Sequence, residues 1–230
     1  MEAVRDLIAN DAALSRILEE ARARLTSDPG HDVAHCLRVA EWTIRLGGAS
    51  VHPRQAIAAA LLHDVINIPK DSPDRTSASE RSADFARRLL TELGFDEIDL
   101  ICAAIHDHSY STGRVPRSPL GDALQDADRL EALGALGIFR TASCGARIGA
   151  DYFDGDDPWA ERRDLDDAKH TIDHFFRKLL LLPPTLRTKT GCEEAERRAK
   201  FMIAFLRQLG DEIGSPPPAW RISAAERPRR

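Results

Sequence analysis

Residues 53–65 read PRQAIAAALLHDV, a stretch that is apolar on nearly every side and carries a histidine and an aspartate, His63 and Asp64, just before its last residue. Pro53 suits the first position of a helix, because the N–H that proline lacks has no partner there in any case. A helix that is apolar all round is normally buried, so the sequence predicts a central helix over 55–65. An unpaired buried aspartate costs several kcal/mol, so we expect His63-Asp64 to have a compensating partner.

The segments on both sides of this stretch also show helical spacing of their apolar residues. No alternating strand pattern of useful length occurs, so the sequence predicts an all-α fold, a helical bundle. Stretches rich in glycine, proline and polar residues predict loops over 70–79, 109–119 and 143–158. The further helices are expected over 7–25, 32–46, 79–93, 96–106, 124–140, 165–181 and 192–209.

The chain has 230 residues, of which 43% are hydrophobic and 30% are charged. This balance is typical of a folded globular protein, and the length suits one compact domain, which we place at 1–212. Residues 213–230 are rich in proline and arginine and are expected to form a tail that lacks order. The formal net charge of −5 provides no basic field for a nucleic-acid backbone, so polymeric nucleic acid is not an expected partner.

Features that would direct the chain to a membrane or an oxidising compartment are not seen. The first ten residues lack the basic start and apolar stretch of a secretory signal, and no apolar run approaches the roughly 20 residues that span a bilayer. The four cysteines form no CxxC pair and are expected to be reduced thiols. The sequence therefore predicts a cytoplasmic protein without a membrane partner.

Four residues form the strongest candidate for chemistry: His35, the pair His63-Asp64, and an aspartate near position 128. Each lies on a different expected helix, and a helical bundle can bring such side chains to one interior site. Two imidazoles and two carboxylates suit manganese, iron, nickel, zinc or magnesium better than a soft copper site. The spacing alone leaves an alternative open, in which Asp64 caps a helix or pairs with an arginine and His63 is a core histidine.

The same residues stand in sequence words that resemble those of a known family. Residues 31–40 (HDVAHCLRVA), 61–64 (LLHD) and 126–130 (DADRL) resemble the H…HD…D signature of HD-domain phosphohydrolases. Residues 67–73 (NIPKDSP), 108–111 (HSYS) and 125–135 (QDADRLEALGA) resemble a branch of small bacterial HD proteins. The resemblance covers nearly all of 1–212 and implies a single HD-domain helical bundle with a metal site between its central helices.

The resemblance implies His35, His63, Asp64 and Asp128 as metal ligands. Asp126 is the rival for the last place, and residues two apart on a helix project about 200° from each other, so both should not reach one ion. The word at 127–130, ADRL, favours Asp128. Asp126 would then accept a hydrogen bond from a ligand histidine.

The activity that the resemblance implies is metal-dependent hydrolysis of small phosphorylated metabolites. One divalent ion (Mn, Mg, Ni, Fe, Co or Zn, with Mn favoured) would activate a water that attacks phosphorus. The expected substrates are nucleoside or deoxynucleoside triphosphates, cut to monophosphate and pyrophosphate. A nucleoside monophosphate 5′-nucleotidase, a nucleotide-sensing module without catalysis, and a di-iron oxygenase using His31, His106 and His108 are the alternatives. A homodimer is among the assemblies that the resemblance allows.

The sequence also provides candidate residues for proton transfer and for phosphate binding. Some HD nucleotidases carry a glutamate three residues after the paired aspartate, but here that position is Asn67. Besides Asp64, the catalytic candidates are therefore Asp71 and His31, which could carry the proton of the leaving group. Positive charge for phosphate is expected from nearby basic residues, and His108 adjoins the 109–119 loop. The substrate-binding candidates are Lys70, Arg129, Lys178 and His108.

Overall fold

The computed structural model describes residues 1–25, 32–66, 68 and 74–226. In these ranges the chain is all-α: no strand occurs, and an isolated β-bridge joins Asp151 to His170. The chain divides into two compact units, Met1–Asp128 and Arg129–Arg230. The predicted all-α class is confirmed.

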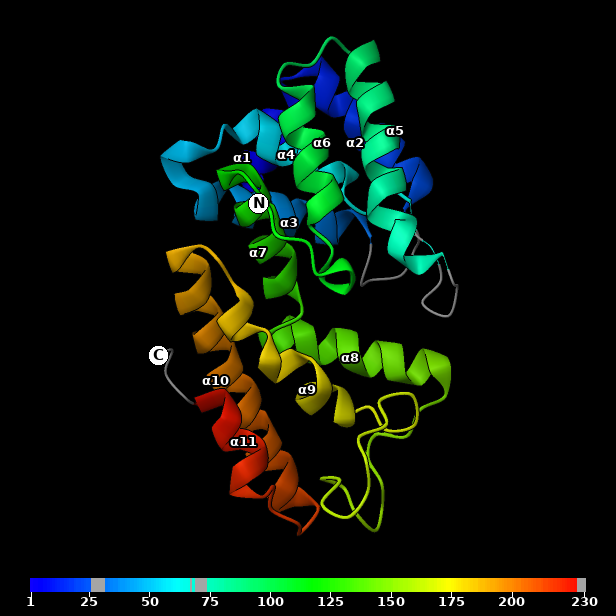
Figure 1. The fold of residues 1–230 in the computed structure, drawn as a ribbon, viewed down its shortest axis with the longest axis vertical. Coiled ribbons are helices and arrows are strands. Elements are labelled where there is room, and N and C mark those ends of the chain that lie inside the picture. Colours follow the sequence, from blue (N-terminus) through cyan, green and yellow to red (C-terminus); the bar gives the residue numbers. More distant parts are fainter. Residues whose placement is uncertain (26–31, 67, 69–73, 227–230) are drawn as a thin grey trace. The chain divides into compact units, whose positions relative to one another are not determined.

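The first unit is built around helix α4 (Pro53–Leu62), which contacts α1, α2, α3, α5 and α6 (Figure 1). Every side chain from Ala56 to Leu62 is completely buried, as expected for a helix that is apolar all round. The elements that begin in this unit, besides α4, are α1 (Glu2–Ala9), α2 (Ala12–Arg24), α3 (Val33–Gly47), α5 (Ala78–Glu92), α6 (Ile98–Asp107) and α7 (Pro119–Glu131), with 3-10 turns η1 (Gly48–Ser50), η2 (Arg75–Ser77) and η3 (Tyr110–Thr112).

The second unit contains α8 (Gly134–Ile148), α9 (Asp173–Arg177), α10 (Lys189–Glu212) and α11 (Ala219–Glu226). The long α10 contacts α8 and α11, and 3-10 turns η4 (Leu179–Leu181) and η5 (Pro183–Thr185) lead into it (Figure 1). Arg198 on α10 donates to the backbone carbonyl of Leu130 at 2.6 Å. This bond supplies a partner for a carbonyl at the C-terminal end of α7.

Two expected helices are each divided in the structure. The segment 7–25 forms α1 and α2, because Asp11 accepts hydrogen bonds from the N–H groups of Ala13 and Leu14 and so begins a new helix. The segment 124–140 forms α7 and α8, because Leu133 is extended and Gly134 has φ of 74°. Glycine adopts this left-handed conformation without the cost that a Cβ would add.

Two further expectations are wrong in the second unit. The loop predicted over 143–158 begins later, because α8 continues to Ile148. The helix predicted over 165–181 is reduced to α9, because the buried Asp173 carboxylate binds Arg163 and the N–H of Asp166 and so folds the preceding chain into a loop. The expected tail also contains structure, since α11 occupies 219–226, and Arg221 donates to the carbonyls of Trp159 and Ala160.

None of the helices in the described ranges combines the length and the apolar character that crossing a membrane requires.

Candidate metal centre

His35 enters the site from the first turn of α3. Asp32 caps this helix, and its carboxylate accepts a hydrogen bond from the backbone N–H of His35 at 2.7 Å. The His35 side chain is completely buried. The cap therefore fixes where the helix begins, and with it the point from which the imidazole projects.

His63 lies directly after the last residue of α4, where the chain leaves the central helix. Its Nδ1 is 2.7 Å from the carbonyl oxygen of Ala60, so Nδ1 carries the proton and donates. Nε2 is then left with its lone pair. That atom is completely buried and has no hydrogen-bond partner among the described residues.

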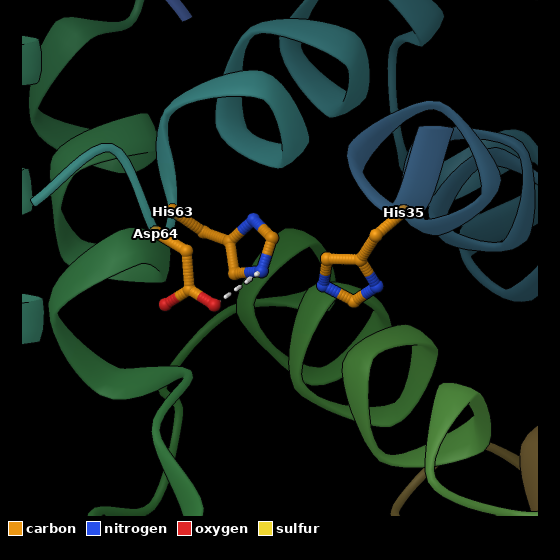
Figure 2. A group of neighbouring side chains, drawn as sticks. All are labelled: His35, His63 and Asp64. Atoms are coloured by element: carbon orange, nitrogen blue, oxygen red, sulfur yellow. Dashed lines mark ion pairs between the residues drawn. The ribbon is translucent and has the colours of Figure 1, made fainter. Parts of the chain in front are cut away.

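Two carboxylates face these imidazoles. Asp64 Oδ2 is 3.5 Å from His63 Nε2, and Asp128 Oδ1 is 3.5 Å from His35 Nε2 and 3.9 Å from His63 Nε2. Figure 2 shows the rings of His35 and His63 reaching toward each other from two helices, with Asp64 beside His63. His35, His63 and Asp64 each offer a ligand atom, and these three atoms lie within 4.8 Å of one another.

A third imidazole approaches the same carboxylate from the end of α6. His108 is buried, its Nδ1 is 2.6 Å from the carbonyl oxygen of Ile105, and its Nε2 is 3.4 Å from Asp64 Oδ1. The ring centroids of His63 and His108 are 4.9 Å apart. The two oxygens of Asp64 therefore face two different histidines.

The buried environment separates the proton affinities of these groups. Burial lowers the pKa of His63 to about 4, with the Asp64 carboxylate opposing part of that shift. Burial acts in the same direction on His108, but the adjacent Asp64 carboxylate outweighs it and raises the pKa of His108 above its ordinary value. Burial raises the pKa of Asp128, but the His63 and His35 imidazoles outweigh it, so that pKa lies below its ordinary value. At neutral pH His63 is thus a neutral imidazole, and the Asp128 carboxyl group is ionised.

This donor set fits a divalent metal ion. Nitrogen and oxygen ligands at about 2.0–2.2 Å from an ion lie about 3.0–3.5 Å from one another, which is close to the separations found here. Side chains that hydrogen-bond directly would stand closer, at about 2.7–3.2 Å. His35, His63, Asp64 and Asp128 would hold the ion, and a buried Nε2 lone pair without a hydrogen bond is what such an ion satisfies.

Asp128, one of the two rival aspartates, has its carboxylate within 4 Å of both His35 and His63. Asp126 is completely buried on the same helix. Cys36, next to His35, is buried too, and burial together with the nearby carboxylates raises the pKa of its thiol well above the ordinary value. Cys36 is therefore a protonated core residue.

The other residues singled out from sequence occupy varied positions. Arg129 is buried and its guanidinium donates to the carbonyl of Thr185 at 2.7 Å, so it supports the second unit. Lys178 lies between α9 and η4 in that unit. His106 is partly exposed and its Nδ1 pairs with Asp107 at 2.6 Å. His31, Lys70 and Asp71 lie outside the described residues, so their roles stay predictions.

Gln125 is a supporting residue that the sequence reasoning did not single out. It is buried on α7, and its Nε2 donates to the carbonyls of Asp107 at 2.8 Å and Arg114 at 3.1 Å. These bonds tie the segment that carries His108 to the helix that carries Asp128. A single glutamine on a helix gives no signal for this role, because its partners are backbone atoms of a distant segment.

Comparison of the chain with known proteins identifies a matching family. The family profile described as HD domain matches residues 33–133, a range that contains all four candidate ligands. YpgQ of Bacillus subtilis (strain 168), which is described as uncharacterized, is 34% identical over 190 residues, covering 80% of this chain and 85% of YpgQ.

Solved structures agree with that relationship. The structure of B. subtilis YpgQ in complex with ADP has a TM-score of 0.67 and 28% identity, covering 86% of this chain and 97% of YpgQ. The structure of an HD-superfamily hydrolase from Bacillus thuringiensis has a TM-score of 0.64 and 28% identity, covering 87% of this chain and 96% of that one.

Proposed function

The chain belongs to the HD domain family, whose solved relatives include HD-superfamily hydrolases, and from this premise we propose that it is a metal-dependent phosphohydrolase acting on nucleotides. The favoured reaction is the cleavage of a nucleoside or deoxynucleoside triphosphate to monophosphate and pyrophosphate. Manganese is the favoured ion, with Mg, Ni, Fe, Co and Zn as the other candidates.

The observation that carries the proposal is the buried Nε2 of His63, which has no hydrogen bond among the described residues and faces the carboxylates of Asp64 and Asp128 at 3.5 and 3.9 Å. Leaving such an atom unsatisfied in the interior would cost about 1–3 kcal/mol. A divalent ion removes that cost. An ion at this place would also lower the pKa of a bound water and polarise a phosphoryl oxygen.

The residues of the chain have distinct tasks in this proposal. The carbonyl of Ala60 holds His63 in the tautomer that exposes the Nε2 lone pair, and the cap by Asp32 sets the position of His35. Asp64 and Asp128 are each about one quarter exposed, so a ligand can reach this side of the centre. Asp71 and His31 remain the proposed carriers of the leaving-group proton, and Lys70 the first proposed phosphate contact.

A nucleotide substrate is supported by the relatives. The similar YpgQ protein has been solved with ADP, and a nucleoside diphosphate carries the phosphate chain and the base that a nucleotide hydrolase recognises. A metal centre of mixed nitrogen and oxygen ligands suits phosphate oxygens, which are hard donors. A monophosphate 5′-nucleotidase is the second candidate, and the reaction products separate it from the triphosphate reaction.

The test is product chromatography after incubation of metal-stripped protein, resupplied with Mn²⁺, with nucleoside mono-, di- and triphosphates. Wild type and His63→Ala run side by side, and His52→Ala serves as a matched control because His52 only caps α4, through a bond to the N–H of Arg54. Monophosphate and pyrophosphate released by wild type and His52→Ala but not by His63→Ala are the expected result. Orthophosphate from monophosphates would move the assignment to a nucleotidase, and tight binding without product would indicate a sensing module.

A further inference from the structure

We propose that His108 is an additional metal ligand of this centre, binding the ion through Nε2 beside Asp64 Oδ1. The inference rests on the proposed metal-dependent function and deepens it. It also revises the sequence-based expectation that His108 contacts substrate.

The first argument is the way in which His108 is held. His63 Nδ1 bonds the carbonyl oxygen three residues before it, Ala60, at 2.7 Å, and His108 Nδ1 bonds the carbonyl three residues before it, Ile105, at 2.6 Å. Both bonds fix the ring and place the proton on Nδ1, which is the arrangement of a metal-ligating imidazole. Both rings then direct Nε2 to the carboxylate of Asp64.

The second argument is a distance. Among the described residues, His106 and His174 hydrogen-bond aspartates directly, at 2.6 Å to Asp107 and 2.7 Å to Asp167, while His170 Nε2 stands 3.7 Å from Asp154 in a looser ion pair. His108 Nε2 stands 3.4 Å from Asp64 Oδ1, close to the 3.5 Å that separates His63 Nε2 from Asp64 Oδ2. The spacing is that of two ligands on one ion and exceeds that of a hydrogen-bonded pair.

A direct contact with phosphate fits His108 less well. Its Nε2 faces a carboxylate oxygen, and a phosphate placed there would be repelled by Asp64. The ring is also 3% exposed, whereas His106, two residues earlier, is partly exposed. A buried imidazole next to a carboxylate is better suited to a cation.

The third argument is the support of the segment. Gln125 donates to the carbonyl of Asp107, the residue before His108, and to that of Arg114 beyond it. Gln125 lies on α7, three residues before Asp128, so one helix positions both a ligand carboxylate and the segment of His108. Fixed orientation of this kind is what a metal-binding side chain needs.

The experiment is Co²⁺ binding by metal-free wild type, His108→Ala and His106→Ala. His106 is the matched control, because it lies on α6 of the same chain and pairs with Asp107 away from Asp64. We expect His108→Ala to bind Co²⁺ at least tenfold more weakly and to change the visible d–d spectrum, while His106→Ala keeps both affinity and spectrum. Weaker binding with an unchanged spectrum would make His108 a positioning residue and overturn the proposal.

A second measurement needs no variant and so does not depend on the folding of His108→Ala. Wild-type protein labelled with ¹⁵N-histidine and loaded with ¹¹³Cd²⁺ should show cadmium–nitrogen coupling at Nε2 of three imidazoles: His35, His63 and His108. Coupling at His35 and His63 alone would overturn this inference and leave the proposed function standing. Wild type that binds neither cation would contradict both.

Discussion

Two aspartates, Asp173 in the second unit and Asp64 in the first, differ in the distances to the side chains that surround them. In the second unit, the completely buried Asp173 receives Arg163 at 2.5 and 3.0 Å and the N–H of Asp166 at 2.7 Å, so both its oxygens are bonded. In the first unit, the oxygens of Asp64 face His63 and His108 at 3.5 and 3.4 Å. The cluster around Asp173 is held together by direct hydrogen bonds. The groups around Asp64 instead have the spacing of ligands that bind one ion.

The largest effect is expected from Asp64→Asn. Loss of this carboxylate should abolish stable metal binding and reduce turnover by about 10³-fold or more, which corresponds to about 4 kcal/mol in the barrier. The free energy of unfolding of the metal-free protein should fall less than in Asp173→Ala, because the lost interaction with His108 is offset by relief of the repulsion between Asp64 and Asp128. Metal content by mass spectrometry, steady-state turnover and urea unfolding are the measurements. Turnover within threefold of wild type would contradict the site.

The same comparison predicts the opposite behaviour for Asp173→Ala. Removal of Asp173 takes from Arg163 its nearest carboxylate and from the N–H of Asp166 its acceptor, so the free energy of unfolding should fall by about 3–5 kcal/mol. Metal content per folded chain should stay at the wild-type value, because Asp173 bonds to Arg163 and Asp166 of its own unit. A variant that is as stable as wild type would show that the bonded cluster is not a structural one.

Removal of the metal by a chelator is a third test that distinguishes the metal centre around Asp64 from the cluster around Asp173. An ion that binds only the folded chain stabilises it by about 2.7 kcal/mol when its free concentration is 100 times its dissociation constant. Removal of the ion should therefore lower the melting temperature of wild type and of Asp173→Ala alike, and should leave Asp64→Asn unchanged. The check is a thermal scan with chelator and after resupply of Mn²⁺. A chelator effect that persists in Asp64→Asn would place the stabilising ion elsewhere.

Local sequence signals predicted much of the first unit. The apolar run from Ala56 to Leu62 predicted the buried central helix, which the structure confirms. The split at Asp11 was missed, because an aspartate in a periodic helical segment is ambiguous until its carboxylate is seen on the N–H of Ala13. The shortening of the helix expected over 165–181 was missed because Asp173 takes its partner, Arg163, from outside that segment.

In the candidate site too, residues in local sequence motifs were predictable, whereas contacts made between distant segments were not. His35, His63 and Asp64 stand in recognisable words, and the structure brings them within 4.8 Å of one another. The place of His108 depends on the carbonyl of Ile105 and on the Gln125 bonds to Asp107 and Arg114, and none of these contacts has a signature in the sequence. The distance to Asp64 that distinguishes a ligand from a bonded pair follows from packing alone.

The smallest change in stability is expected at Glu194, an acidic residue of the second unit that is hydrogen-bonded and partly exposed. Glu194 receives Arg197 and Arg198 at 2.7 Å, and hydrogen bonding, chiefly from Arg197, lowers its pKa from 4.5 to about 2 against the opposing effect of burial. A depressed carboxyl pKa stabilises the fold above pH 4.5, and this stabilisation is lost as the pH falls toward 2. Glu194→Gln should therefore cost about 1–2 kcal/mol at pH 7, and the difference from wild type should shrink over that window.

The two arginines that bind Glu194 differ in exposure, so replacing each one tests how much burial adds to the pair. Arg197 is 72% exposed, whereas Arg198 is 12% exposed and also binds the carbonyl of Leu130. Exposed pairs contribute about 0–1 kcal/mol, so Arg197→Gln should change stability less than Arg198→Gln does, although the hydrogen bond from Arg197 is the largest single influence on the pKa of Glu194. Urea unfolding of the three variants at pH 7 and pH 3 measures both points. Equal stability losses in the two arginine variants would mean that the bond from Arg198 to Leu130 adds nothing. They would also mean that burial of the arginine does not change how much a pair with Glu194 stabilises the fold.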